Sequence, residues 1–502
     1  MPGSAPAEPL DRATVAAATD AALSRARDLG ATNAEVRVER IRSQSLRLRD
    51  GRLESAADGV EIGVGVRVVH QGSIGFAASV AVGPDAAAAL AAQAVGAART
   101  TAAASGRPVV LAPEPAHGQV DWTSPHDVDP VTVPLAEKVA LLEGWSTRLL
   151  SAPGVDHVTA YVLAVSEEKH YADLAGTVAV QRRVRLHPAV EAMAVGGDGF
   201  ETMRTLAPPV GRGWEYLHGR GWDWESELAT LPELLAEKLA APSVDAGAYD
   251  LVIDPTNLWL TIHESVGHAT ELDRAMGYEA AYAGTSFATL DQLGSLRYGS
   301  AVMHVVGDRT TPHGLATVAI DDEGVAASSF DLVRDGLLVG YQLDRSIAAT
   351  ADLGPSNGCA YADSPLHVPI QRMANVSLQP APGDGPTTEE LIAGVDHGLY
   401  ITGDKSWSID MQRYNFQFTG QRFYRIEHGR LAGQVRDVAY QATTTDFWGS
   451  LEAVGGTSTY LLAGAFNCGK GQPGQVAPVS HGSPSALVRD VRILNTREES
   501  GR

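Results

Sequence analysis

A change in sequence texture near residue 243 constrains the fold more than any other feature of this chain. Before it, alternating apolar and polar residues at 34–79 and 157–199 predict long antiparallel strands. Alanine-rich or amphipathic runs predict helices at 10–30, 84–100, 134–152 and 226–242. After it, nearly every segment is a short β run bounded by Gly, Asp or Pro.

We therefore expect an α+β fold made of two domains. A chain of 502 residues is too long for one ordinary hydrophobic core. The first domain, residues 1–243, should combine an antiparallel sheet with helices. The second, residues 244–502, should be mainly β and should carry one motif-bearing helix after the strand-like run at 249–255.

Several loops follow from composition. Three dipeptides predict turns between the first strands: Asp50-Gly51, Asp58-Gly59 and Gln71-Gly72. Residues 1–8 are expected to be disordered, and the proline-rich stretch 105–132 is expected to be a long surface connection.

The overall charge and the cysteine count exclude some classes of protein. A formal charge of −21, with the arginines scattered, disfavours nucleic-acid binding. No apolar run is long enough to span a membrane, and the start of the chain lacks the pattern of a secretion signal. Two cysteines in a chain of this length fit a reducing compartment, so we expect a cytoplasmic protein.

The run TIHESVGHATE at 261–271 holds the chemistry, in the pattern His263-Glu264-x-x-x-His268. Two imidazoles can bind a zinc ion, and the carboxylate of Glu264 can take a proton from a metal-bound water as general base. Taken alone, the string also fits a polar pair on a helix that binds no metal. The spacing is one residue longer than the common H-E-x-x-H motif.

That extra residue poses a geometric problem. Five steps of about 100° place the second side chain roughly 140° from the first on a regular α-helix. His263 and His268 can face one metal only if the helix widens by one residue, as in a π-bulge, or ends between them. Gly267 is a weak helix former, so a distortion there costs little.

A third ligand is available in AFNCGKGQPGQ at 465–475, where Cys468 stands among glycines. We expect an irregular turn with an accessible thiol that approaches the histidines from another segment. Two histidines, one cysteine and one open position form the ligand set of a catalytic zinc. Cys359 is expected to be an ordinary buried thiol.

HESVGHATELD together with FNCGKGQPGQ resembles the TldD/PmbA family of metallopeptidases. Further family-like stretches follow in the same order: DGRLESAADGVEIGVGVRVVHQGSIGFAAS at 50–79, AIDDEG at 319–324, RDGLLVGYQLDR at 334–345 and QRMANV at 371–376. The resemblance implies that His263, His268 and Cys468 bind Zn²⁺ and that Glu264 is catalytic. It also implies the motif-bearing, TldD-like branch, which cleaves unfolded or small modified peptides inside a closed dimer. The partner would be a second copy or a TldE-like paralogue.

Two other interpretations stay open. The chain could be a non-catalytic partner subunit of a TldD/TldE-type complex, or a regulatory protein with a structural metal. A structural zinc normally has four protein ligands, so a fourth ligand from Cys359 or a histidine would favour the second. His481 follows the Cys468 run and is the first of five unassigned histidines to test. The five, all in the C-terminal half, are His304, His313, His367, His397 and His481.

Overall fold

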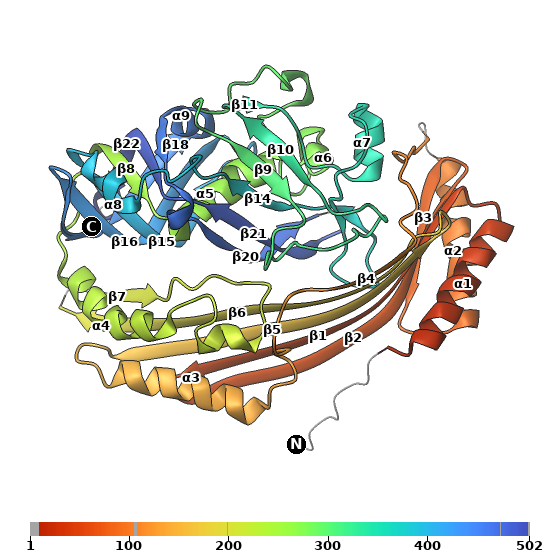
Figure 1. Cartoon of the computed structure of the whole chain (residues 1–502), viewed down its shortest axis with the longest axis horizontal. Helices are drawn as coiled ribbons and strands as arrows, with labels where there is room; N and C mark the ends of the chain where they lie inside the picture. The colour runs from red at the N-terminus through yellow and green to blue at the C-terminus, as the bar shows by residue number, and fades with distance from the viewer. Residues whose placement is uncertain (1–9, 105–107, 198, 472, 500–502) are drawn as a thin grey trace.

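The computed structural model describes residues 10–104, 108–197, 199–471 and 473–499. The predicted disorder at 1–8 lies outside the described residues. The chain forms two layers: a long curved sheet from the N-terminal half, and a mainly β half that lies on one face of it (Figure 1).

The curved sheet is antiparallel except at one edge, where β4 runs parallel to β6. In spatial order its strands are β3 (Ser73–Ser79), β2 (Arg52–His70), β1 (Asn33–Arg49), β5 (His157–Asp173), β6 (Val178–Gly196) and β4 (Gln119–Thr123), with β7 (Gly199–Arg204) also paired to β6. The turns predicted at Asp50-Gly51 and Gln71-Gly72 are confirmed, and all four residues have positive φ.

The two faces of the sheet differ chemically along β1. In β1, Val36 and Val38 pack in an apolar cluster with residues of two helices, α1 (Arg12–Asp28) and α2 (Pro84–Ala102). The alternate side chains face the C-terminal half and are charged: Arg37 donates to the carbonyl oxygen of His367 and pairs with Asp322. Buried ion pairs of this kind join the sheet to the half above it, together with small apolar contacts such as that of Val165 with Leu315 and Phe466.

Four helices cover the sheet at its two ends (Figure 1). At one end lie α1 (Arg12–Asp28) and α2 (Pro84–Ala102), and at the other lie α3 (Leu135–Leu150) and α4 (Trp224–Ala240). The second pair is joined by the stacked rings of Trp145 and Trp224, whose centroids are 4.6 Å apart. All four helices were predicted from the sequence.

The C-terminal half is built on a sheet whose strands close on themselves, because β15 pairs with both β8 and β16. Its strands are β8 (Gly247–Ile253), β15 (His397–Ile409), β16 (Asn415–Glu427), β17 (Arg430–Val435), β18 (Val438–Thr443), β19 (Leu451–Val454) and β22 (Ala486–Asn495). Smaller sheets surround it: β9 (Val305–Asp308), β10 (Ser329–Arg334), β11 (Leu337–Leu338) and β14 (Asn375–Leu378); β12 (Ala360–Tyr361) and β13 (Ile370–Gln371); β20 (Leu461–Lys470) and β21 (Gln475–Ser483).

Short helices connect these strands. They are α5 (Pro255–Ile262), α6 (Leu272–Ala275), α7 (Arg345–Ala351), α8 (Thr388–Ala393), α9 (Thr444–Gly449) and α10 (Thr496–Glu499). The α+β class with a mainly β C-terminal half is thus confirmed. The division into domains at residue 243 stays a prediction; it falls between the end of α4 and the start of β8.

Three local expectations were wrong. No turn forms at Asp58-Gly59, because β2 pairs with β1 straight through it and the Asp58 carboxylate accepts hydrogen bonds from Arg42 and Gln44. The stretch 105–132 is not only a connection, since it contains β4. The run around Cys468 is not an irregular turn: β20 continues through Lys470, so the thiol lies on a strand.

Within the described residues, no helix is both long enough and apolar enough to cross a membrane.

Candidate metal centre

The motif lies on a fully buried helix that starts at the end of β8. Asp254 caps α5 by accepting a hydrogen bond from the Thr256 amide, and Pro255 occupies the first turn, where its missing N–H has no consequence. Asn257 fixes the helix to the closed sheet by donating to the carbonyl oxygens of Gly403 and Thr419 at 2.9 and 3.1 Å. The helix therefore enters the site with little freedom to shift.

The helix then widens, as the spacing of the two histidines requires. Residues His263–Gly267 form a π-helical turn, in which the His268 amide donates to the carbonyl oxygen of His263. The imidazoles converge, with ring centroids 4.7 Å apart. Of the two geometries that the sequence allowed, the structure adopts the π-helical one.

Two features stabilise this turn. Gln342 donates to the carbonyl oxygen of Gly267 at 2.7 Å, and Trp448 donates to the Ser265 hydroxyl at 2.9 Å. Gly267 also has no room for a side chain, since a Cβ there would lie 2.6 Å from Sδ of Met373. Because Gly267 has ordinary right-handed helical dihedrals, it is the close approach of Met373, and not the backbone conformation, that favours a glycine here.

Cys468 completes the cluster from β20. The ligand atoms of His263, His268 and Cys468 lie within 4.8 Å of one another, and the Cys468 Sγ is 3.7 Å from Nε2 of His268. All three side chains are buried, so the expectation of a solvent-accessible thiol was wrong. The structure nevertheless brings together the three residues that the sequence singled out as metal ligands.

A chain of hydrogen bonds sets the tautomer of His263. The Nδ1 of His481 lies 2.8 Å from the Val376 carbonyl oxygen, which can only accept, so His481 donates from Nδ1. The Nε2 of His481 must then accept from Nδ1 of His263, 2.7 Å away. This leaves Nε2 of His263 unprotonated and available to a metal.

His268 is oriented in a different way. Its Nδ1 lies 2.8 Å from the Glu271 carboxylate, so Nε2 again carries the free lone pair. Lys470 neutralises this carboxylate at 3.1 Å and also donates to Asp273 at 2.8 Å. Although burial acts in the opposite direction, Lys470 and His268 hold the pKa of Glu271 well below its usual value.

The protonation states suit a soft divalent cation. Burial lowers the pKa of His268 to about 3 and the pKa of His263 well below its ordinary value, so both imidazoles are neutral at pH 7. Burial also raises the pKa of the Cys468 thiol to about 11. Two neutral imidazoles and one thiol that ionises only beside a cation form a donor set for zinc-like metals.

Glu264 has a partner that the sequence analysis did not identify. Arg413, in the turn between β15 and β16, forms a partly buried ion pair with the Glu264 carboxylate. Burial raises the pKa of Glu264, and Arg413 partly offsets this increase. The motif carboxylate is therefore held in place by a cation from a different hairpin.

The cluster forms part of the wall of a cleft of about 420 Å³. Its walls come from both halves of the chain: residues 204–209 and His187 from the first, and residues of α5, β15 and β20 from the second. His263, Glu264, His268 and Cys468 all line it. The site thus opens toward a space large enough for an extended ligand.

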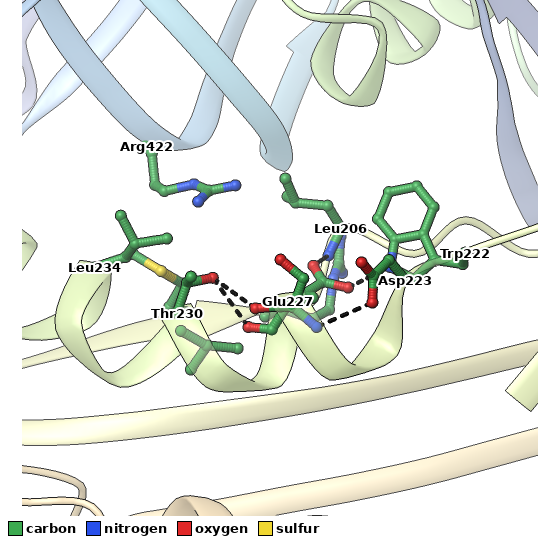
Figure 2. A pocket seen from close by; sticks show the side chains of 11 residues that line it. Leu206, Trp222, Asp223, Glu227, Thr230, Leu234 and Arg422 are labelled. Atoms are coloured by element: carbon green, nitrogen blue, oxygen red, sulfur yellow. Dashed lines mark hydrogen bonds between the residues drawn. The ribbon is translucent and has the colours of Figure 1, made fainter. Parts of the chain in front are cut away.

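A second pocket of about 340 Å³ adjoins this cleft and shares Arg204 and Leu206 with it. Figure 2 shows Glu227 and Thr230 on α4, with Arg422 of β16 on the opposite side. Trp222 and the Leu206 amide both donate to the Glu227 carboxylate. The two pockets together give a continuous polar and apolar surface between the halves of the chain.

The other candidates have different surroundings. Cys359 is buried as expected, and burial raises its pKa to about 12. His304 and His367 pair with partly buried carboxylates, His313 lies beside the Gly211 carbonyl oxygen, and His397 packs on Tyr249. Of the five unassigned histidines, only His481 contacts a residue of the metal cluster within the described part of the chain.

The sequence analysis missed Arg413, Glu271, Lys470 and His187. Glu271 and Lys470 lie inside the two quoted motif strings, so their positions were a clue to their role. Arg413 and His187 lie far from the motif in sequence, and no local pattern marks them.

Comparison with known proteins agrees with this geometry. The model of the PmbA/TldA metallopeptidase C-terminal domain matches residues 246–495, and that of PmbA/TldA metallopeptidase domain 1 matches residues 34–98. A metalloprotease of Methanothermobacter thermautotrophicus is 28% identical over 92% of this chain and 95% of its own length. A zinc metalloprotease TldD homolog of Saccharolobus solfataricus is 25% identical over 54% of this chain and 57% of its own.

Solved structures share the fold. A Thermotoga maritima protein described as a proposed modulator of a DNA gyrase aligns with a TM-score of 0.74 at 16% identity, over 95% of this chain and 99% of its own. TldE from Thermococcus kodakarensis aligns with a TM-score of 0.71 at 16% identity, over the same shares. With its fold, its domain matches and its metalloprotease relatives taken together, this chain belongs to the TldD/PmbA family.

Proposed function

We propose that this protein is a zinc-dependent peptidase of the TldD-like branch, with His263, His268 and Cys468 as metal ligands and Glu264 as general base. The observation that carries the proposal is the meeting of three ligand atoms within 4.8 Å in the wall of a cleft, with Glu264 beside them. Relatives named as metalloproteases over nearly the whole chain support the same class of activity.

When bound, zinc would polarise the scissile carbonyl and acidify the attacking water. Glu264 would take a proton from that water and pass it to the leaving amine, a role that contributes about 10²–10⁴-fold. Arg413 holds the Glu264 carboxylate in position, and its charge favours the ionised form that a general base needs. His481 and Glu271 keep both histidines in the tautomer that presents Nε2 to the metal.

The shape of the cleft supports a peptide substrate, and the resemblance to the family suggests which peptides. Its walls include residues 463–469 of β20, whose one partner strand in the described residues is β21. An extended peptide can pair with a free strand edge through main-chain hydrogen bonds, with little dependence on side chains. We propose unfolded or small modified peptides as substrates, and the adjoining pocket adds room for residues beyond the cleavage site.

The alternative is a non-catalytic or regulatory subunit with a structural metal. Such a metal would need a fourth protein ligand. Neither Cys359 nor His481 belongs to the ligand cluster found among the described residues, and His481 instead supports His263 from behind. This arrangement favours a position left open for substrate.

A closed dimer, with a second copy or a TldE-like paralogue, and a cytoplasmic location complete the proposal. Two free cysteines fit a reducing compartment. The fold is shared with TldE from Thermococcus kodakarensis, so a paralogous partner of the same architecture is available in principle.

The test is Glu264→Gln, assayed on an unstructured fluorogenic peptide, alone and with candidate TldE-like chains. We expect zinc content to stay at the wild-type level while cleavage falls at least about 10²-fold. Glu427→Gln, at a carboxylate that is 51% exposed, is the matched control and should cleave normally. Retained cleavage by Glu264→Gln would remove Glu264 from this role, and absence of cleavage by every wild-type combination would favour the alternative.

A further inference from the structure

A small cavity beside the metal centre is lined by four arginines and by no carboxylate. They are Arg183 and Arg185 of β6, Arg309 after β9, and Arg372 after β13. The cavity measures about 10 Å³, and every residue that lines it is buried. Four cations around one small space lined by buried residues are unusual, because each buried charge normally has its own counter-charge.

The nearby carboxylates do not neutralise all four. Glu167 serves both Arg183 and Arg185, at 3.0 and 2.8 Å. Asp322 is engaged by Lys169 at 2.6 Å. Asp321 accepts hydrogen bonds from three main-chain amides and forms no ion pair with any of the four arginines, and burial and the neighbouring Glu323 raise its pKa.

Neither Arg372 nor Arg309 forms an ion pair with a carboxylate of the described residues. Arg372 donates to the main-chain carbonyl oxygens of Cys468 and Gln475. The Arg309 side chain makes no hydrogen bond or ion pair within the described residues, although only 2% of the residue is exposed. Burial accordingly lowers the pKa of Arg309, with no bonded acceptor to restore it.

The unused donors belong to these same side chains. Among the described residues, Nε and Nη1 of Arg185, Nε of Arg309 and Nε of Arg372 are buried without a hydrogen-bond partner. Leaving a buried charged donor unsatisfied is costly, so a ligand that accepts several hydrogen bonds and carries negative charge would stabilise the folded state.

We propose that the cavity binds a monovalent halide ion, with chloride as the physiological occupant. The volume fits one small sphere, which excludes phosphate, sulfate and carboxylate ligands. A water molecule would fit, but it accepts two hydrogen bonds and leaves the positive charge of Arg309 and Arg372 unbalanced. A halide accepts from all directions and supplies the missing charge.

Such an ion would also act on the metal centre. Arg372 joins Cys468 on β20 to Gln475 on β21, so it holds both arms of the hairpin that carries the thiol. An anion that fixes Arg372 therefore fixes the hairpin. This site does not depend on the proposed peptidase activity, and its test uses readouts other than cleavage.

The first test is crystallographic. Crystals of the wild-type protein grown in bromide should show an anomalous peak between the guanidinium groups of Arg309 and Arg372. A cavity that holds only water in bromide-grown crystals would overturn the proposal. This measurement does not depend on whether any variant folds.

The second test is thermal unfolding of the chelated protein in sodium chloride against sodium gluconate at equal ionic strength. Above the dissociation constant, Tm should rise by about 1–2 °C for each tenfold increase in chloride, with no such rise in gluconate. Arg309→Gln should abolish the difference between the salts, while the exposed control Arg430→Gln should keep it. Equal effects of the two salts on the wild type, or a chloride effect that survives in Arg309→Gln, would contradict the proposal.

Discussion

Replacing His481 tests how the metal centre is held. In the wild type its Nε2 accepts from Nδ1 of His263, and its Nδ1 donates to the carbonyl oxygen of Val376. His481→Phe keeps an aromatic ring of similar size in this fully buried position but removes the acceptor. Without a metal, His263 can respond by moving its proton to Nε2, which faces the cleft.

That response is not available when a metal occupies Nε2. The Nδ1–H of His263 must then stay buried without an acceptor, which costs about 1–3 kcal/mol. This penalty falls on the metal-bound state alone, so it corresponds to a loss of about 5- to 150-fold in metal affinity. The range agrees with the roughly 10–100-fold effect of losing an outer-shell partner of a ligating histidine.

The assay is competition for zinc with a chromophoric chelator at pH 7.5. His481→Gln should recover part of the affinity, because its side-chain oxygen can accept from His263 where Phe cannot. His397→Phe, at an exposed histidine that packs on Tyr249, controls for loss of an imidazole. The reasoning fails if His481→Phe binds zinc as tightly as the wild type, or if His397→Phe weakens it equally.

Three further substitutions test the surroundings. Gly267→Ala should lower the free energy of unfolding by up to about 2 kcal/mol, because the new Cβ would lie 2.6 Å from Sδ of Met373. The better helix propensity of alanine offsets only part of this strain. An increase in the free energy of unfolding, measured in urea, would contradict the prediction. Lys470→Met should cost about 3–5 kcal/mol, because Glu271 would keep only Arg274, at 3.5 Å, as a cationic partner and Asp273 would lose its ammonium donor; a loss below about 1 kcal/mol would refute that role. His187→Phe should reduce the loss of folding stability in acid. Burial and Arg204 lower the pKa of His187 to about 4 in the folded protein, so between pH 6.5 and 4 the unfolded chain binds a proton that the folded protein does not. Stability of the wild type therefore falls, by at most about 3 kcal/mol, as the pH falls through that window. The check is the free energy of unfolding of the metal-free wild type and variant, measured at pH 6.5 and at pH 4. The same pH dependence in both proteins would disprove the prediction.

The sequence predicted the elements that depend on local pattern. The helices that cover the sheet and the strand pairs joined at Asp50-Gly51 and Gln71-Gly72 follow from periodicity and turn chemistry. The turn predicted at Asp58-Gly59 does not form, because the same dipeptide can lie within a strand when neighbouring side chains donate hydrogen bonds to the carboxylate. Here the donors are Arg42 and Gln44. Tertiary hydrogen bonds decided the outcome there, and no local pattern reports them.

At the metal centre, too, local features could be predicted from the sequence and long-range contacts could not. The motif spacing implied a widened or broken helix, because two ligands five residues apart cannot otherwise face one metal. The strand at Cys468 was missed, since its glycines weigh against a regular strand when read alone. Arg413 could not be found from the sequence, since it contacts the motif across a large separation in the chain. His481 was the first of the unassigned histidines to test, but its contact with His263 could not be predicted for the same reason.

The course of β20 explains why Cys468 and Lys470 occur together. Residues two apart on a strand point to the same face, and these two are buried while Gly469 between them is exposed. One strand therefore brings both the thiol that approaches His268 and the cation that balances Glu271 behind the same histidine. An irregular turn could present the thiol but would not fix the position of Lys470 relative to it. A one-residue slip of β20 against β21 would turn both groups away at once, so the register of this hairpin controls the ligand set and its charge balance together.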